Sequence, residues 1–436
     1  MGTKVKLAIA CLARKTFDYI AAQELYSKAL LNLKKIADLQ IYPAQEIIYL
    51  PEQAIAAGEY FASANVDGVI LFSGTFHLGH LALEIKKKTD KPILLWAPEE
   101  LPYDGGKIRL NSVCGINLDA SNLYKSGYYD YTYCIGDSID LDWINAIKAQ
   151  NAIAKAAIAI AGYRADGFFN LDVNELALYK TFGCLIDHYE LSEIYNSTPS
   201  NELILQYKQK ITSSFELNIS QEKLEKTAVL CAKFAHFFKE KGITALALRC
   251  WPEFARDFGI APCAAMSVLQ AEGYIISCEG DIDCTLTMIA HRAMGEGAPY
   301  IADISQADLT DNSVLLWHCG AAPLCHANTA QGCSLESYHA GGAGVTADFV
   351  LKEGQINLAR LDSVNGKYRL FCANGTAINC QRKLKGTYAK AVLEEELPLL
   401  LDKIIYNGLA HHVSIAYGDY SAAFKILARN LGIEIL

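Results

Sequence analysis

Two short apolar runs decide how the middle of this chain folds: Tyr274-Ile275-Ile276-Ser277-Cys278-Glu279-Gly280-Asp281 and Pro299-Tyr300-Ile301-Ala302-Asp303-Ile304. Each run has the composition of a buried parallel strand, and the intervening segment 282–296 has the pattern of a helix. Together they predict a strand–helix–strand unit whose two strands run in the same direction. Glu279 and Asp303 end these strands, so we expect both carboxylates at the carboxyl edge of one sheet, where α/β proteins bind ligands.

The residues before and around these runs predict two α/β domains. Buried apolar runs such as Lys4–Cys11 and Gly68–Phe72 alternate with helical patterns such as Phe17–Ala37. This alternation is typical of a doubly wound parallel sheet. We therefore expect one such domain over residues 1–165 and a second one, carrying the two carboxylates, over residues 166–305.

From about residue 306 the pattern changes to short alternating strands separated by turn residues. The expected strands are Leu315–His318, Gly344–Phe349, Gln355–Leu361 and Tyr368–Ala373. Asn365-Gly366, between the last two, is a strong signal for a tight hairpin turn. We expect residues 306–436 to form a mostly antiparallel, barrel-like domain. Long helices are expected at 140–161, closing the first domain, and at about 388–404.

Composition argues against several classes of protein. The chain has 436 residues, 52% of them hydrophobic, yet no apolar stretch reaches the roughly 18–20 residues that a membrane span needs. The net charge of −9 disfavours a nucleic-acid binder, which needs a basic face. The apolar run Leu7–Ala13 is followed at once by Arg14-Lys15, unlike an export signal. We expect a cytoplasmic protein whose 14 cysteines, which contain no Cys-x-x-Cys spacing, stay reduced.

Glu279, Asp303 and the later pair His411-His412 form the chain's strongest candidate for a site. Two carboxylates and one imidazole suit Mn²⁺, Mg²⁺ or Co²⁺ better than a metal that prefers thiolates. The alternative interpretation is structural, because acidic residues at strand ends often cap the following helix, and Asp281 or Asp283 could do so here.

The same stretches resemble the L-fucose isomerase family, with a weaker likeness to L-arabinose isomerase. The matching residues are Ser277-Cys278-Glu279-Gly280-Asp281, Ile301-Ala302-Asp303-Ile304 and Gly408-Leu409-Ala410-His411-His412-Val413. In that family a Glu after a strand, an Asp about 24 residues later and a late His hold one Mn²⁺. The resemblance also implies the three-part architecture expected above, and the chain is shorter than typical L-fucose isomerases.

The resemblance implies a role for each of these residues. Glu279 and Asp303 would bind the metal and share the roles of catalytic base and acid, and which one is the base stays open. The Ala-His-His stretch is close to the arabinose isomerase pattern, in which the second His is the ligand. His412 would therefore bind the metal, with His411 as a nearby donor.

The reaction implied is the interconversion of an aldose and its ketose through an enediolate. A divalent metal polarises the carbonyl, and a carboxylate moves the proton between C1 and C2. The sugar stays open: L-fucose, D-arabinose or another aldose, including an anionic one such as sulfoquinovose, because Arg14 or Arg249 could receive an anion. The alternative is a non-catalytic sugar-binding or regulatory protein on a periplasmic-binding-like α/β scaffold. A metal-dependent aldolase is a third possibility.

Further candidates for binding the sugar are polar or aromatic side chains beside predicted strands or helices. They are Arg14, His77, Trp251, His318, Cys319, Asn407 and His411. Trp251 would offer a ring face to the sugar, although a Trp at this position is also typical of a hydrophobic core. In the family the first domain of one subunit covers a neighbour's site. Arg14 and His77 would then act across an interface of a homo-oligomer, a trimer or hexamer, although solvated surface residues would need no such role.

Overall fold

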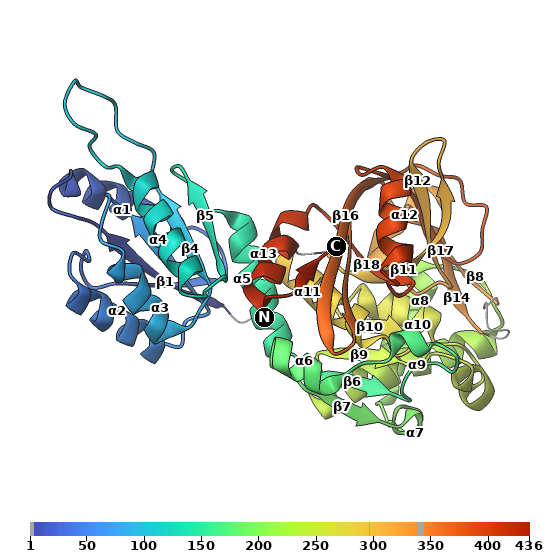
Figure 1. Ribbon diagram of the computed structural model, residues 1–436. Coiled ribbons are helices and arrows are strands. Elements are labelled where there is room, and N and C mark those ends of the chain that lie inside the picture. The colour runs from blue at the N-terminus through green and yellow to red at the C-terminus, as the bar shows by residue number, and fades with distance from the viewer. Residues whose placement is uncertain (1–3, 296, 338–343) are drawn as a thin grey trace. The chain divides into compact units, whose positions relative to one another are not determined.

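The computed structural model describes residues 4–295, 297–337 and 344–436 (Figure 1). The chain divides into two compact units, each described here by itself. The first unit consists of Met1–Asn151 and Lys425–Ile433, and the second consists of Ala152–Phe424 and Glu434–Leu436. The predicted domain boundaries after residues 165 and 305 stay predictions.

The first unit is built on a five-stranded sheet. Its strands are β1 (Val5–Leu12), β2 (Leu39–Pro43), β3 (Gly68–Ser73), β4 (Ile93–Ala97) and β5 (Tyr131–Ile135). They lie in the order β2-β1-β3-β4-β5 and every neighbouring pair is parallel. Because the order reverses direction at β1, successive crossovers go to opposite faces, as expected for a doubly wound sheet.

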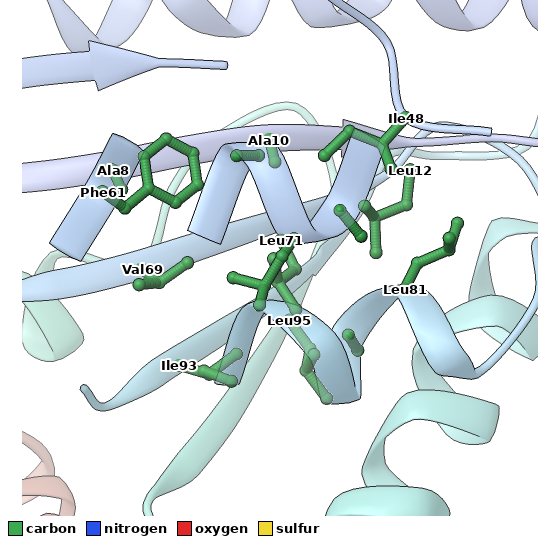
Figure 2. Packing of buried hydrophobic residues seen from close by; sticks show 14 of the residues in the cluster. Ala8, Ala10, Leu12, Ile48, Phe61, Val69, Leu71, Leu81, Ile93 and Leu95 are labelled. Carbon is green, nitrogen blue, oxygen red and sulfur yellow. The ribbon is translucent and has the colours of Figure 1, made fainter. Parts of the chain in front are cut away.

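Helices cover both faces of this sheet. They are α1 (Tyr19–Leu33), α2 (Pro51–Ser63), α3 (His80–Thr89), α4 (Ser112–Lys125) and α5 (Leu141–Ala154). Alternate residues of β1 point to opposite faces. Ala8, Ala10 and Leu12 pack with residues of α2 and α3 such as Phe61 and Leu81 (Figure 2), whereas the residues between them pack against α1 and α5. The predicted doubly wound domain is confirmed.

The second unit begins with a four-stranded parallel sheet. Its strands are β6 (Ile158–Ala161), β7 (Ile186–Tyr189), β9 (Ala245–Leu248) and β10 (Ile275–Cys278), in the order β10-β9-β6-β7. The helix predicted over 140–161 is wrong at its end, because α5 stops at Ala154 and β6 follows. All four residues of β6 are buried. A strand buried on both faces lacks alternation, so its pattern does not distinguish it from a core helix.

The helices of the second unit include one that is buried almost all round. They are α6 (Glu175–Phe182), α7 (Leu191–Tyr195), α8 (Asn201–Ser214), α9 (Gln221–Lys241), α10 (Cys263–Gln270), α11 (Ile282–Met294) and α12 (Leu397–Tyr406), while α13 (Ser421–Leu431) spans both units. Nearly every residue of α11 is buried, and this helix contacts both the parallel sheet and the strands described next. A helix that is covered on all sides occupies the centre of its unit.

The remaining strands form a ten-stranded, mostly antiparallel sheet. They are β8 (Glu216–Asn218), β11 (Tyr300–Asp308), β12 (Ser313–His318), β13 (Ser334–Glu336), β14 (Thr346–Val350), β15 (Gly354–Val364), β16 (Lys367–Ile378), β17 (Thr387–Leu393), β18 (His412–Tyr417) and β19 (Glu434–Ile435). Six of them follow one another as β16-β15-β18-β11-β12-β17, and an extra pairing of β16 with β17 closes the ring. The predicted barrel-like architecture is confirmed.

The predicted strand–helix–strand unit around Glu279 and Asp303 is only half right. The helix α11 does connect the two strands, but β10 belongs to the parallel sheet and β11 to the barrel, where it is antiparallel to β12 and β18. A buried apolar run indicates a strand without indicating the direction of its partner, so the sequence could not separate the two sheets.

Two further predictions concern the barrel. The Asn365-Gly366 turn is confirmed, since Val364 pairs with Lys367 and both turn residues have positive φ, 52° and 72°. The helix predicted at about 388–404 is wrong at its start: residues 387–393 form β17, and α12 begins at Leu397.

Among the described residues, no helix combines the length and the apolar character needed to cross a bilayer.

Candidate metal centre

His412 and Asp303 face each other across two neighbouring barrel strands. His412 is the first residue of β18 and pairs with Asp303 on β11 in antiparallel register. Opposite residues in such a pair project to the same side of the sheet. The ring nitrogen Nε2 of His412 lies 3.8 Å from Oδ1 of Asp303. The His412 side chain is buried, with 1% of its surface exposed.

Glu279 reaches the same point from the turn between β10 and α11. Its φ is +63°, in the left-handed region that residues with a side chain rarely adopt, and Gly280 follows at +75°. Two backbone bonds hold this turn: Ala165 donates to the Glu279 carbonyl at 3.0 Å, and Gly280 donates to the Leu248 carbonyl at 3.1 Å. As a result, Oε2 of Glu279 lies 3.4 Å from Nε2 of His412.

Two pairs of donor atoms, His412 with Glu279 and His412 with Asp303, are each close enough to share one ion. Two donor atoms that each lie about 2.1 Å from one ion can be at most about 4.2 Å apart, and the distances from His412 to Glu279 and Asp303 are 3.4 and 3.8 Å. Moreover, Nε2 of His412 and Oδ1 of Asp303 are buried without a hydrogen-bond partner in the described structure. Buried polar atoms are nearly always paired, so an absent partner at this point is the expected sign of a ligand site.

Two more histidines extend the cluster. Donor atoms of Glu279, His318 and His412 lie within 4.8 Å of one another, and so do those of Asp303, His411 and His412. His318 ends β12, is buried, and accepts a hydrogen bond at its Nδ1 from the backbone N–H of Cys319 at 3.0 Å. The donors are carboxylates and imidazoles without a thiolate, a set that suits hard or borderline divalent cations.

Charge in the cluster favours ionised carboxylates. Burial raises the pKa of Glu279, but a hydrogen bond from His411 and the nearby imidazoles of His412 and His318 outweigh this effect and lower it. Burial likewise opposes ionisation of Asp281, yet the adjacent Arg360 guanidinium and His412 hold its pKa far below the usual range. Deprotonated carboxylates are the form that binds a cation.

Asp281 has a second contact that the sequence did not reveal. As the structural interpretation predicts, it caps α11: Oδ1 accepts from the Cys284 N–H at 2.8 Å. Its other oxygen, Oδ2, lies 3.0 Å from Nδ1 of His412 and accepts from Arg360 at 2.8 Å. The available signal was an arginine, Arg360, inside the apolar strand segment Leu358–Leu361. Such a residue needs a buried anionic partner.

Aromatic side chains line one side of the cluster. The ring of Phe168 lies 5.3 Å from that of His411 and 6.2 Å, edge to face, from that of Trp251. Asn170 contacts Nδ1 of His411 at 3.3 Å. Phe168 thus lies between Trp251 and His411, and a role for Trp251 in binding a sugar stays a prediction. Sequence reasoning missed Phe168 and Asn170, because they lie in an irregular loop without a recognisable motif.

The other candidates have different surroundings. Asn407 follows α12, and its amide donates to the Lys403 carbonyl at 2.8 Å, which satisfies the end of that helix. Arg249 is already paired with Glu253, at 3.0 Å, so its charge is compensated. Cys319 follows His318 and touches the site through the backbone bond described above.

Arg14 and His77 belong to the first unit. Arg14 is exposed just after β1, and its backbone N–H donates to Oγ1 of Thr75 at 2.8 Å. His77 is fully buried, with Nε2 2.9 Å from Oδ2 of Asp119 and Nδ1 2.9 Å from the Thr75 carbonyl. Burial opposes protonation of His77, but the Asp119 carboxylate outweighs it and raises the pKa of this histidine. A role for either residue in binding a sugar stays a prediction.

The C-terminal part of the chain is similar to a known protein family. Residues 316–436 match the family model described as L-fucose isomerase, C-terminal domain, a stretch that contains His318, His411 and His412. Together with the relatives described next, this match confirms the predicted resemblance of the chain to L-fucose isomerases and its class, aldose–ketose isomerase.

Several similar proteins are named sulfoquinovose isomerase. One from Priestia megaterium is 28% identical, over 97% of this chain and 97% of its own length. Another from Alkalicoccus urumqiensis is 24% identical, over 86% of each chain. Among solved structures, a periplasmic solute-binding protein from Actinobacillus succinogenes with bound D-allose matches 67% of this chain and 91% of its own at 11% identity. Its TM-score of 0.18 supports no conclusion about fold or function.

Proposed function

We propose that this protein is a Mn²⁺-dependent aldose–ketose isomerase acting on an anionic aldose of the sulfoquinovose type. The observation that carries the proposal is that Glu279 and Asp303 each lie near Nε2 of His412, in two donor groups that share this histidine. Two of their buried donor atoms have no partner in the described structure and lie at distances that suit one ion. The names of the similar proteins support the choice of sugar.

The reaction needs a proton moved between C1 and C2 of the sugar and another between O1 and O2. A divalent ion held by the three side chains would polarise the carbonyl and stabilise negative charge on the adjacent oxygens. Glu279 and Asp303 share the proton transfers, giving an enediolate of the sugar as one carboxylate removes the carbon proton. Such a step by a positioned carboxylate contributes roughly 10²–10⁴-fold to the rate.

The surroundings of Glu279 fit a role in proton transfer, and neighbouring side chains could contact the sugar. Two backbone bonds hold the peptide between Glu279 and Gly280, and the Glu279 carboxylate lies 3.4 Å from the imidazoles of His411 and His412. His318 and His411 are additional donors for the sugar hydroxyls. Trp251 and Phe168 offer apolar ring surfaces to the C–H face of a sugar ring.

Recognition of the anionic group needs a cation that is not already paired. Arg249 is compensated by Glu253, whereas Arg14 is exposed after β1 and has no ion pair among the described residues. We place Arg14 at the anionic group of a sugar bound by a neighbouring subunit, in a homo-oligomer of three or six chains.

The burial of His77 against Asp119 supports a role in holding the loop around Thr75. The 14 cysteines form no disulfide in the described structure, which supports a cytoplasmic location.

The test follows sugar conversion by NMR with chelator-treated protein before and after Mn²⁺ is added back. We expect sulfoquinovose to be converted to its ketose only when Mn²⁺ is present, and faster than L-fucose or D-arabinose. Equal conversion without metal would contradict the metal dependence. Sugar binding without conversion would favour the binding-protein alternative, and release of a shorter carbon fragment would favour an aldolase.

A further inference from the structure

A buried chain of charges runs from the barrel to His412. Arg360, on β15, is one of the largest fully buried side chains, with 1% of its surface exposed. Its Nε donates to Oδ1 of Asp362 at 2.9 Å and its Nη1 donates to Oδ2 of Asp281 at 2.8 Å. The other oxygen of Asp362 accepts from Arg369 at 2.7 Å. Because burying a charge is costly, a structure retains such a chain only when every member is paired.

The last member of this chain is His412. Oδ2 of Asp281 lies 3.0 Å from Nδ1 of His412, and Nη1 of Arg360 also donates to the His412 carbonyl at 3.1 Å. The Asp281 carboxylate beside the guanidinium is ionised and has no hydrogen to donate, so its Oδ2 is an acceptor for the histidine as well. Nδ1 of His412 therefore carries the hydrogen. In the neutral ring this leaves Nε2 with its lone pair, and Nε2 is the atom that faces Glu279 and Asp303 without a partner in the described structure.

We propose that Arg360, acting through Asp281, is a positioning device that fixes the tautomer and orientation of His412. This inference rests on the proposed metal site. A histidine that binds a metal commonly donates its other N–H to a carboxylate, which sets the tautomer and strengthens the ligand. Here the carboxylate is itself held in place by a buried guanidinium that contacts both Asp281 and the backbone of His412.

Capping of α11 does not account for this arrangement. The cap uses one oxygen of Asp281, Oδ1, which accepts from the Cys284 N–H. The other oxygen, Oδ2, is directed at His412 and at Nη1 of Arg360, whose Nη2 also donates to Oδ1 at 3.4 Å. None of these contacts is needed to begin a helix. The two functions can therefore be separated by substitution: Ser is a good N-cap residue but has no carboxylate to offer His412.

The test measures the affinity of the metal-free full-length protein for Mn²⁺ by calorimetry, without any assay of activity. Asp281→Ser retains the cap and removes the contact with His412. Loss of an outer carboxylate of this kind typically weakens metal binding about 10–100-fold, and we expect a loss in that range. The matched control is Asp348→Asn, which removes a buried carboxylate from another guanidinium, that of Arg382 at 2.6 Å, outside the chain that leads to His412. We expect its affinity to stay within about 3-fold of the wild type, a change much smaller than loss of an outer carboxylate.

Equal losses in the two variants, or no loss in Asp281→Ser, would overturn the inference. A second measurement, ¹⁵N NMR of the metal-free protein with labelled histidine, should show His412 protonated at Nδ1; protonation at Nε2 in the wild type would also overturn the inference.

Failure of the proposed function would give a different result. Wild-type protein that binds no Mn²⁺, or binds it and converts no aldose, would contradict that function, whereas the tautomer and the Asp281→Ser comparison test the positioning role.

Discussion

At the scale of single residues, the site depends on side chains held in unusual positions. Glu279 has a left-handed backbone, a conformation that costs about 1–3 kcal/mol in a residue with a side chain and persists only where its surroundings enforce it. His412 lies between Asp281 on one ring nitrogen and two carboxylates near the other. The strained backbone of Glu279 and the contacts of His412 each direct a donor atom into the cluster.

Substituting Glu279 by Gln tests the role of its carboxylate. Gln has nearly the same shape but cannot accept a proton at neutral pH, so we expect the fold to be retained and turnover to fall by about 10²–10⁴-fold. Steady-state kinetics and circular dichroism measure the two quantities. Glu240→Gln, on the exposed side of α9, is the control and should have normal turnover. Near-normal turnover of Glu279→Gln would remove this residue from the mechanism.

The residues of the site were only partly predictable. Glu279, Asp303 and His412 each stand beside a buried strand in a stretch that resembles a known family, so local sequence pointed to them. Asp281 was predictable as a helix cap but not as the partner of His412, which is 131 positions away. Arg360 is 79 positions from Asp281. Contacts at such separations depend on strand order, which a local pattern does not contain.

At the scale of elements, a single turn positions Glu279. The turn joins β10, in the parallel sheet, to α11, which runs towards the barrel. A Cβ added to Gly280 would lie 2.4 Å from the Tyr163 carbonyl oxygen, so the loop after β6 packs directly on the turn. Element types were predictable here, because the two apolar runs are as short as strands and the segment between them has helical spacing. The pairing partners of β10 and β11 were not, because both strands are simply buried.

Substituting Gly280 by Ala measures how tightly this turn is packed. The positive φ alone should cost about 1 kcal/mol of unfolding free energy, and the clash with the Tyr163 carbonyl should add about 1–3 kcal/mol. Gly242→Ala is the matched control, since Gly242 has a φ of +66° but nothing within 4 Å of the added Cβ. Urea denaturation would compare the two. A similar loss in both variants would show that the contact with Tyr163 contributes little.

At the scale of the whole molecule, a closed barrel and a parallel sheet contribute different parts of the proposed metal site. The barrel supplies Asp303 and His412 from adjacent strands, and the parallel sheet supplies Glu279. The sequence indicated a change from α/β to mostly antiparallel structure near residue 306, because turn signals become frequent there. Closure of the barrel through β16 and β17 was not predictable in detail, since part of β17 has the composition of a helix.

The central claim is that Glu279, Asp303 and His412 hold one divalent ion, and Mn²⁺ titration of the metal-free protein tests it most directly. We expect the wild type to bind one ion per chain. His412→Ala should weaken binding at least about 100-fold, the upper end of what loss of an outer partner costs. Cys325→Ala, which alters an exposed thiol, should leave the affinity unchanged. Equal affinities in the wild type and His412→Ala would contradict the claim.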